Sequence, residues 1–416
     1  MERRVVITGL GAITPCGTRV DTMWKEICNG ASGVNTITRF DTTDFDVRIA
    51  GQAWGFQPEQ YFDKRDNRRT DRFVQFAVAA SQEAIDDAGL IITESNAERV
   101  GVYIGTAFGG LESLEAVHLQ LLHKGPKRVS PLFPAIVLGN LAAGQVSIRF
   151  GASGPNNSSV TACAAGAHSI GEAFHLIARG AADIMIAGGT EAVITPLAVS
   201  AFSNMRALST RNDAPQQASR PFDGERDGFV MAEGAGMLIL EELQHARRRR
   251  APIYAEVLGY GSAGDAYHLT APCPDGAGAA RCMRNALQDA GISADMVDYI
   301  NAHATSTAAG DLAETEGIKA IFTTRAHAIP ISATKSMTGH MLGAAGAVES
   351  ILTVLALYHG ILPPTINYEH PDPACDLDYI PNEARQVRIR TALCNSFGFG
   401  GTNASLVFRA VDTSAC

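Results

Sequence analysis

The sequence lacks the features that mark several classes of protein. Its eight cysteines include no Cys-x-x-Cys pair, and no histidines stand at zinc-finger spacing, which argues against a structural metal site and a disulfide scaffold. Positive charge is scarce, because 34 Lys and Arg against 43 Asp and Glu leave a net charge of −9. A basic protein that binds nucleic acid is therefore not expected, and neither is a bound metal.

Long apolar segments are also missing. The chain enters a strand-like run at Val5 with no apolar stretch of signal-peptide length before it. The most apolar late stretch, 341–357, carries Glu349 and is short for a bilayer. We therefore expect a cytoplasmic protein with reduced thiols and no contact with membranes.

The residues that are present predict a layered α/β fold. Hydrophobic residues make up 46% of the 416 positions, as in a well-cored globular protein, and short β-branched runs bounded by glycine alternate with helical segments. The expected strands are 5–8, 100–104, 183–187, 237–240, 253–258, 297–301, 329–332 and 404–409. The expected helices are 72–88, 112–123, 164–179, 278–290, 311–322 and 343–358.

Two of the expected helices begin alike, with Ala-Ala-Gly-Ala at 164–167 and again at 344–347. Both continue with mainly apolar residues, which predicts buried helices packed closely on a neighbour. Such a repeat indicates two duplicated halves, although alanine-rich sequence can also repeat by chance. We expect the halves to be residues 1–250, which carry a cysteine motif, and 251–416, which carry two histidine motifs.

One cysteine stands where a nucleophile would. The run Ser159–Cys163 leads from a strand-like stretch into the small-residue start of the helix 164–179, a pattern typical of a strained turn that presents a side chain. Helix N–H groups near the sulfur would favour the reactive thiolate over the thiol. A buried and inert thiol is the alternative for a free cysteine.

Two histidines follow expected strands. His303 lies in Asn301–Thr307, after the strand 297–301, and His340 precedes the second buried helix. A histidine at a helix N-terminus resists protonation, and its neutral ring can donate an N–H to a developing oxyanion. Each histidine alone is better explained as a satisfied polar residue than as a catalyst, but the repeat would bring Cys163 and His340 face to face.

A glycine-rich segment, Asn395–Asn403, precedes the last expected strand. Such a loop can turn backbone N–H groups toward a ligand atom. A phosphate cradle is the rival interpretation, but the loop leads into a strand and lacks the lysine pattern of a P-loop. An oxyanion hole is the better interpretation.

These motifs, together with Lys335–His340, resemble the motif set of the β-ketoacyl-acyl carrier protein synthases over nearly the whole chain, from Val5 to Asn403. The likeness is closest to the synthase II members of dissociated bacterial fatty acid synthesis. It implies a thiolase fold, five-layered αβαβα built from two duplicated halves, in a homodimer. It also implies decarboxylative Claisen condensation of malonyl-acyl carrier protein with an enzyme-bound acyl thioester. No cofactor would be tightly bound, because the substrates arrive on the 4′-phosphopantetheine arm of acyl carrier protein.

The resemblance also implies the roles of the site residues. Cys163 would carry the acyl group, with its oxyanion against the N–H groups of Cys163 and Phe399, while His303 and His340 would hold the enolate oxygen. The supporting positions would be Lys335 paired with Glu314 and Asp311, Phe397, Phe399 and Gly400 in a gating loop, Thr305 and Thr307 on the phosphopantetheine arm, and Phe108 and Phe202 in the acyl pocket.

Basic clusters lie where the family docks its acidic carrier protein. Concentrated positive charge on an acidic protein can steer an acidic partner, although any one cluster is also explained as a solvated face. The clusters comprise Lys64, Arg65, Arg68, Arg69, Lys127, Arg128 and Arg206.

Two positions depart from the family pattern, and three related functions stay open. Ala304 stands where glycine is common, so a slightly different loop geometry is expected beside His303. Phe108 stands where isoleucine often lines the acyl pocket, and its larger ring would either shorten the usable pocket or have to rotate before long chains enter. A ketosynthase of a polyketide or polyene pathway would share all the motifs. A non-catalytic chain-length factor would lack Cys163, and a thiolase would carry a Cys-x-Gly motif, whereas Cys394 is followed by Asn395-Ser396.

Overall fold

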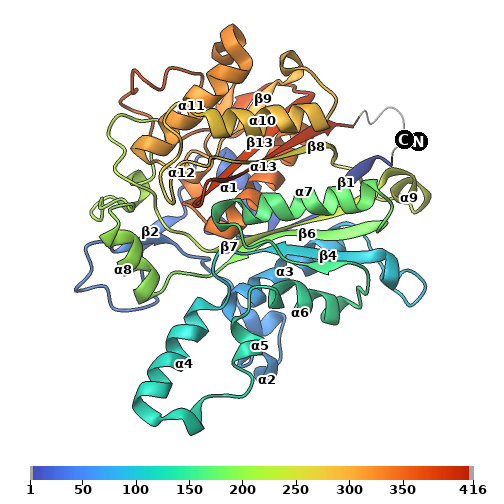
Figure 1. Cartoon of the computed structure of the whole chain (residues 1–416), viewed down its shortest axis with the longest axis vertical. Coiled ribbons are helices and arrows are strands. Elements are labelled where there is room, and N and C mark those ends of the chain that lie inside the picture. Colours follow the sequence, from blue (N-terminus) through green and yellow to red (C-terminus); the bar gives the residue numbers. More distant parts are fainter. Residues whose placement is uncertain (1–2, 412–416) are drawn as a thin grey trace.

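The structure is a computed structural model that describes residues 3–411 (Figure 1); Cys416 lies outside them. The helices are α1 (Val20–Cys28), α2 (Lys64–Asn67), α3 (Arg72–Asp87), α4 (Leu111–Lys124), α5 (Pro134–Val137), α6 (Leu141–Phe150), α7 (Ala165–Ala178), α8 (Pro196–Asn204), α9 (Leu243–Arg248), α10 (Ala277–Asp289), α11 (Ala308–Phe322), α12 (Lys335–Thr338) and α13 (Ala345–His359). The strands are β1 (Val5–Ile13), β2 (Val34–Thr36), β3 (Ile49–Gly51), β4 (Val100–Gly105), β5 (Asn156–Asn157), β6 (Ile184–Glu191), β7 (Gly234–Glu242), β8 (Ala255–Gly264), β9 (Tyr299–Asn301), β10 (Ile331–Ser332), β11 (Ile361–Leu362), β12 (Arg385–Gln386), β13 (Thr391–Gly398) and β14 (Thr402–Ala410).

Ten of the strands are hydrogen-bonded in the order β10-β9-β13-β14-β8-β1-β7-β6-β4-β5. Two sets of five strands extend from the middle of this order: β1-β7-β6-β4-β5 and β8-β14-β13-β9-β10. In both sets, the first two pairs of neighbouring strands are antiparallel and the next two pairs are parallel. The chain completes the first set before it begins the second, and it crosses between them after α9. A topological repeat is therefore present, while the division at residue 250 stays a prediction.

The elements stack in five layers, as the resemblance implied (Figure 1). Helices α3 and α6 cover the outer face of the first strand set, and α10 with α11 covers the outer face of the second. Helices α7 and α13 lie between the two sets. Cys163 and His340 come from the segments that lead into these two central helices, and His303 comes from the segment between β9 and α11.

The two central helices approach each other through glycine. A Cβ on Gly166 would lie 2.9 Å from the carbonyl oxygen of Gly343, and one on Gly346 would lie 3.0 Å from the backbone nitrogen of Ala167. The repeated Ala-Ala-Gly-Ala runs therefore mark a close helix contact. The segment Leu342–His359 is long and apolar enough to cross a membrane, but 89% of it is buried inside the fold, as expected for a core helix.

The glycine-rich segment differs from its expected form. Residues 395–398, interpreted as loop, continue β13 and pair with β14 as far as Gly398 opposite Thr402. The connecting turn is only Phe399–Gly401. Pairing of these residues with β14 decides the strand, because tertiary context overrides the weak strand propensity of glycine.

Candidate active site

Cys163 lies in one turn of 3-10 helix, Ala162–Ala164, that leads directly into α7. Ala162 has a φ of +49°, a left-handed conformation that costs an alanine about 1–2 kcal/mol. The strained turn that the sequence predicted is therefore present. It places Cys163 on the wall of a cavity of about 460 Å³, with 8% of the residue exposed.

The thiol of Cys163 is protonated in the resting site. Burial raises its pKa to about 12; the charge of Lys335 and the backbone N–H of Phe399 oppose this rise, and the carboxylate of Glu191 adds to it. Backbone N–H groups favour the thiolate, as the sequence predicted, but loss of hydration at the sulfur acts in the opposite direction and is the larger effect. Attack on a substrate must therefore release the proton as the new bond forms.

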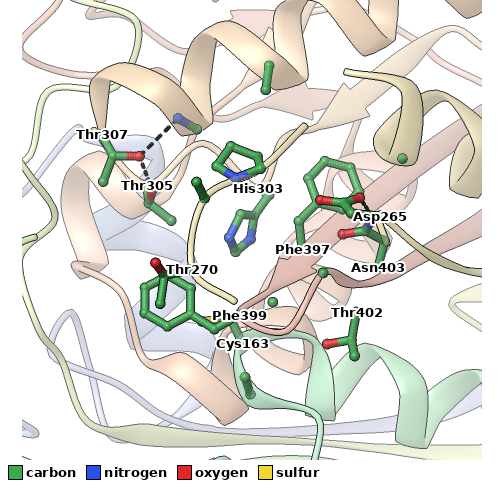
Figure 2. Close-up of a pocket in the computed structure, with 18 of the residues that line it drawn as sticks. Cys163, Asp265, Thr270, His303, Thr305, Thr307, Phe397, Phe399, Thr402 and Asn403 are labelled. Carbon is green, nitrogen blue, oxygen red and sulfur yellow. Dashed lines mark hydrogen bonds between the residues drawn. The ribbon is translucent and has the colours of Figure 1, made fainter. Parts of the chain in front are cut away.

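Two backbone donors face the sulfur, those of Phe399 and of Cys163 itself. Phe399 begins the turn between β13 and β14 and lies beside Cys163 in Figure 2. The two residues after it, Gly400 and Gly401, have φ values of +82° and +69°, which glycine adopts without strain. The N–H of Gly400 is bonded to the carbonyl oxygen of Leu269 at 2.7 Å, so Gly400 shapes the turn and leaves Phe399 as the donor.

His303 and His340 line the same cavity, with their ring centroids 5.4 Å apart. Burial first, and then the charge of Lys335, hold the pKa of both rings well below the usual histidine range. Both rings are therefore neutral. Nδ1 of His303 and both ring nitrogens of His340 have no hydrogen-bond partner among the described residues, which leaves them available to a bound substrate.

Lys335 lies behind the histidines, 1% exposed, and forms an ion pair with Glu349 of α13. The expected pairing with Glu314 and Asp311 is not a direct ion pair among residues 3–411, because Glu349 of the facing central helix binds the ammonium group. Lys335 acts on Glu314 through its charge, which lowers the pKa of that carboxyl group against the larger effect of burial. Sequence analysis noted Glu349 only as a charge in an apolar stretch. A single acid in an otherwise apolar, buried helix was the sequence signal that could have indicated this ion pair, since a buried acid needs a partner.

Glu314 and Asp311 instead shape the loop that carries His303. Glu314 accepts hydrogen bonds from the backbone N–H groups of His303 at 2.9 Å and Ala304 at 2.7 Å. Asp311 accepts one from the N–H of Ser306 at 3.1 Å. Ala304 is accommodated in this loop, with 1% of the residue exposed.

The same loop presents two hydroxyls to the cavity. Thr305 and Thr307 both line it, and their hydroxyls are 3.1 Å apart (Figure 2). The carboxylate of Asp311 also lies 3.6 Å from the guanidinium of Arg226, whose side chain is 4% exposed. Arg226 also donates to the carbonyl oxygen of Thr307 at 3.3 Å. The buried ion pair thus holds the threonine loop from behind, and sequence reasoning missed Arg226.

Aromatic rings form the apolar side of the cavity. Phe108 and Phe202 meet edge to face with centroids 6.2 Å apart, and Phe202 lies 6.4 Å from Phe399. Phe397 lies 5.7 Å from the ring of His303. Phe229, which sequence analysis missed, packs against His340 at 5.5 Å; an isolated phenylalanine gave no sequence signal.

The seven basic residues expected to dock a carrier are all exposed, and none forms an ion pair among residues 3–411. Arg68 and Arg69 line a second cavity, together with Leu132 and Phe133. Arg206 follows α8, which lies apart from α2 in Figure 1. Within one chain the basic residues therefore form separate groups.

Comparison with known proteins identifies related families and chains. The family model for the β-ketoacyl synthase N-terminal domain matches residues 2–246, and that for the C-terminal domain matches residues 254–369. The chain is 52% identical over 410 residues to the 3-oxoacyl-[acyl-carrier-protein] synthase 2 of Coxiella burnetii, with 99% of each chain covered. It is 52% identical over 408 residues to the protein of the same name from Synechocystis, with 98% of each covered.

Solved structures have the same fold. A β-ketoacyl synthase from Burkholderia phymatum is 37% identical with a TM-score of 0.92, and 99% of this chain and 100% of that chain are covered. A ketosynthase chain from a complex of a type II polyketide synthase acyl-carrier protein with its hexaketide-bound ketosynthase is 41% identical. Its TM-score is 0.91, again with 99% and 100% coverage.

Proposed function

The chain belongs to the β-ketoacyl synthase family, and we propose that Cys163, His303 and His340 perform its condensation reaction. The activity is that of 3-oxoacyl-[acyl-carrier-protein] synthase II, an acyltransferase of fatty acid biosynthesis. One observation carries the assignment of residues. A single cavity is lined by Cys163, which lies in a turn and has two backbone donors near its sulfur, and by two neutral histidines. These histidines have ring nitrogens without a hydrogen-bond partner among the described residues, so they are available to a substrate.

The first half-reaction transfers an acyl group to Cys163. Its Sγ attacks the carbonyl carbon of an acyl thioester, and the N–H groups of Cys163 and Phe399 stabilise the tetrahedral oxyanion. The bond to the carrier's sulfur breaks, and the proton of the Cys163 thiol ends on that departing sulfur. Thr305 and Thr307 hold the phosphopantetheine arm during both half-reactions.

The second half-reaction forms the new carbon–carbon bond. A malonyl thioester binds with its carbonyl oxygen against His303 and His340, and its carboxylate leaves as carbon dioxide. The electron pair of the broken bond forms an enolate, whose oxygen accepts N–H bonds from the two neutral rings. The enolate carbon attacks the acyl carbonyl on Cys163, and the thiolate that is released takes up a proton from water.

Acyl carrier protein is the proposed macromolecular partner, in the cytoplasm, and no tightly bound cofactor is needed because the arm belongs to the substrate. The exposed arginines and lysines around Arg68 and Lys127 suit an acidic carrier on a chain of net charge −9.

A homodimer is the proposed assembly. Helix α4 has no buried residue and extends away from the layered body (Figure 1). It exposes Leu114, Leu119 and Leu122 by 42%, 54% and 65%. Leucines exposed together on a projecting helix favour a second chain packed on it.

The pH dependence of decarboxylation tests the roles of the two histidines. Because both pKa values lie well below 6.5, lowering the pH from 8 to 6 leaves the rings neutral. Release of carbon dioxide from a malonyl thioester should therefore stay nearly constant over this range. Because burial also raises the pKa of Glu191 and Asp311 to about 7, any loss of activity in this range is assigned by NMR titration of the imidazole rings. A ring that titrates near 6.5 would contradict the proposal, since it would report an ordinary, solvated histidine.

A polyketide ketosynthase is the second candidate function, favoured by the likeness to the ketosynthase of the polyketide complex. The two candidates differ in the primer that they extend. A synthase of fatty acid elongation extends saturated acyl primers and rejects unreduced β-ketoacyl primers. Repeated extension of unreduced chains with malonyl-acyl carrier protein would favour the polyketide enzyme.

A further inference from the structure

Glu191, the last residue of β6, is a buried acid that has no role in the chemistry above. It is 0% exposed and lies behind the cavity wall, because its neighbours Ala107 and Phe108 line the cavity whereas Glu191 does not. Its carboxylate accepts four hydrogen bonds, from Thr106 Oγ1 at 3.1 Å and from the backbone N–H groups of Ala107 at 2.7 Å, Phe108 at 3.3 Å and Gly343 at 3.1 Å.

These donors belong to two segments that are distant in sequence. Thr106–Phe108 follow β4, and Ala107 and Phe108 line the phenylalanine side of the acyl pocket. Gly343 lies three residues after His340, in the turn that opens the central helix α13. A Cβ on Gly343 would lie 2.5 Å from the backbone nitrogen of Ala107 and 2.7 Å from a carboxylate oxygen of Glu191. The two segments therefore meet at this one carboxylate.

We propose that Glu191 is a positioning residue that anchors the pocket wall at Phe108 to the segment that follows His340, and thereby limits the acyl chains that Cys163 accepts. The proposal rests on the proposed function, in which Cys163 carries the acyl group. Hydrogen bonds to a buried carboxylate are stronger than those between neutral groups. The Phe108 side chain is 48% exposed, so its anchored backbone is the main restraint on how far the ring can turn from the pocket.

The charge of Glu191 provides a readout that a purely structural role would not change. Besides Cys163, the titratable groups that line the cavity or act on its thiol are Glu191 from β6, Lys335 from α12, the neutral His303 and His340, and Asp265, Cys273 and Glu314. Glu191 raises the pKa of the Cys163 thiol and Lys335 lowers it. Burial raises the pKa of Glu191 itself to about 7, so Glu191 carries the charge that the glutamine variant lacks only above that pH. There, removal of the negative charge should make the thiol easier to deprotonate.

The test compares the wild-type chain with Glu191→Gln and with the control Glu241→Gln. Glutamine keeps the shape of glutamate, removes the charge and turns one acceptor into a donor that faces N–H groups. Glu241 is also 0% exposed, but it lies at the opposite end of the β6–β7 pair, opposite Ile184, and binds Arg249. Two quantities are measured: acylation rates of Cys163 with acyl thioesters of graded length, and the pH midpoint of its alkylation by iodoacetamide.

Glu191→Gln should raise the ratio of long-chain to short-chain acylation roughly tenfold, the lower end of a one-methylene discrimination in a pocket. It should also lower the alkylation midpoint by about one pH unit, while Glu241→Gln changes neither quantity. A chain-length ratio equal to that of the wild type overturns the proposal. If the wild-type chain itself shows no acyl group on Cys163, the proposed function fails first, which separates the two failures.

A second variant keeps the test decisive if Glu191→Gln does not fold. Thr106→Val removes one of the four hydrogen bonds to Glu191 and keeps its charge. It should raise the long-to-short ratio by a smaller factor, about twofold, and leave the alkylation midpoint unchanged. An unchanged ratio in Thr106→Val, with a folded chain, also counts against the anchoring role.

Discussion

At the scale of single residues, burial and one buried cation act on three side chains with different outcomes. Burial favours the neutral form of every group, so it raises the pKa of Cys163 and lowers the pKa of His303 and His340. Lys335 lowers all three, so it opposes burial at the thiol and reinforces it at the imidazoles. The resting site is thus a protonated thiol beside two neutral donors, with the lysine held by Glu349.

Phe108 is the residue whose replacement should change substrate choice most simply. Its ring meets Phe202 edge to face on the cavity wall, and isoleucine is smaller and cannot maintain that contact. Phe108→Ile should increase elongation of longer acyl primers by roughly tenfold relative to short ones, measured with malonyl-acyl carrier protein and primers of graded length. Phe150→Ile, at the end of α6 and away from this cavity, is the matched control. An identical chain-length profile in Phe108→Ile would refute the idea.

At the scale of elements, the close contact of α7 with α13 sets the positions of Cys163 and His340. Gly346→Ala would place a Cβ 2.8 Å from Ser396 Oγ and 3.0 Å from the Ala167 nitrogen. We expect a loss of about 1–3 kcal/mol in the free energy of unfolding, measured by urea denaturation. Gly144→Ala in α6 meets nothing within 4 Å and should gain about 0.5–1 kcal/mol. Equal effects of the two changes would show that the helix contact is looser than described.

Elements also show how far sequence alone predicts this molecule. The alternation of strands and helices, and the nucleophile turn at Cys163, are local patterns and were predicted. The last four residues of β13, 395–398, were not, because the glycines at and after Gly398 suggest a loop and only pairing with β14 makes these residues a strand. The partner of Lys335 was also missed, since Glu349 reaches it from an element 14 residues further on. Protonation of the thiol depends on burial, which no motif records.

At the scale of the whole molecule, the net charge is −9, but the surface includes exposed basic side chains that form no ion pair among residues 3–411. Their proposed role is to dock an acidic carrier. Reversal of Arg68 and Arg69 to Glu should raise the apparent KM for acyl carrier protein about tenfold or more, because each change replaces attraction by repulsion. Acylation by small, carrier-free thioesters should be nearly unaffected.

The matched control for docking is Arg247 and Arg248 reversed to Glu. These arginines are also exposed, on α9, which lies at a different side of the molecule from α2 (Figure 1). The control makes the same change in net charge at a site with no proposed role. An unchanged KM in the Arg68 and Arg69 variant, or an equal rise in the control, would remove the docking assignment.

The most direct test of the central claim is to follow the acyl group itself. The chain is mixed with an acyl-carrier thioester, digested, and analysed by peptide mass spectrometry before and after malonyl-acyl carrier protein is added. We predict one acyl group on the peptide that contains Cys163, and its transfer to a β-ketoacyl product with release of carbon dioxide. Formation of that product by a Cys163→Ala chain, or an acyl group carried on any other residue, would contradict the account.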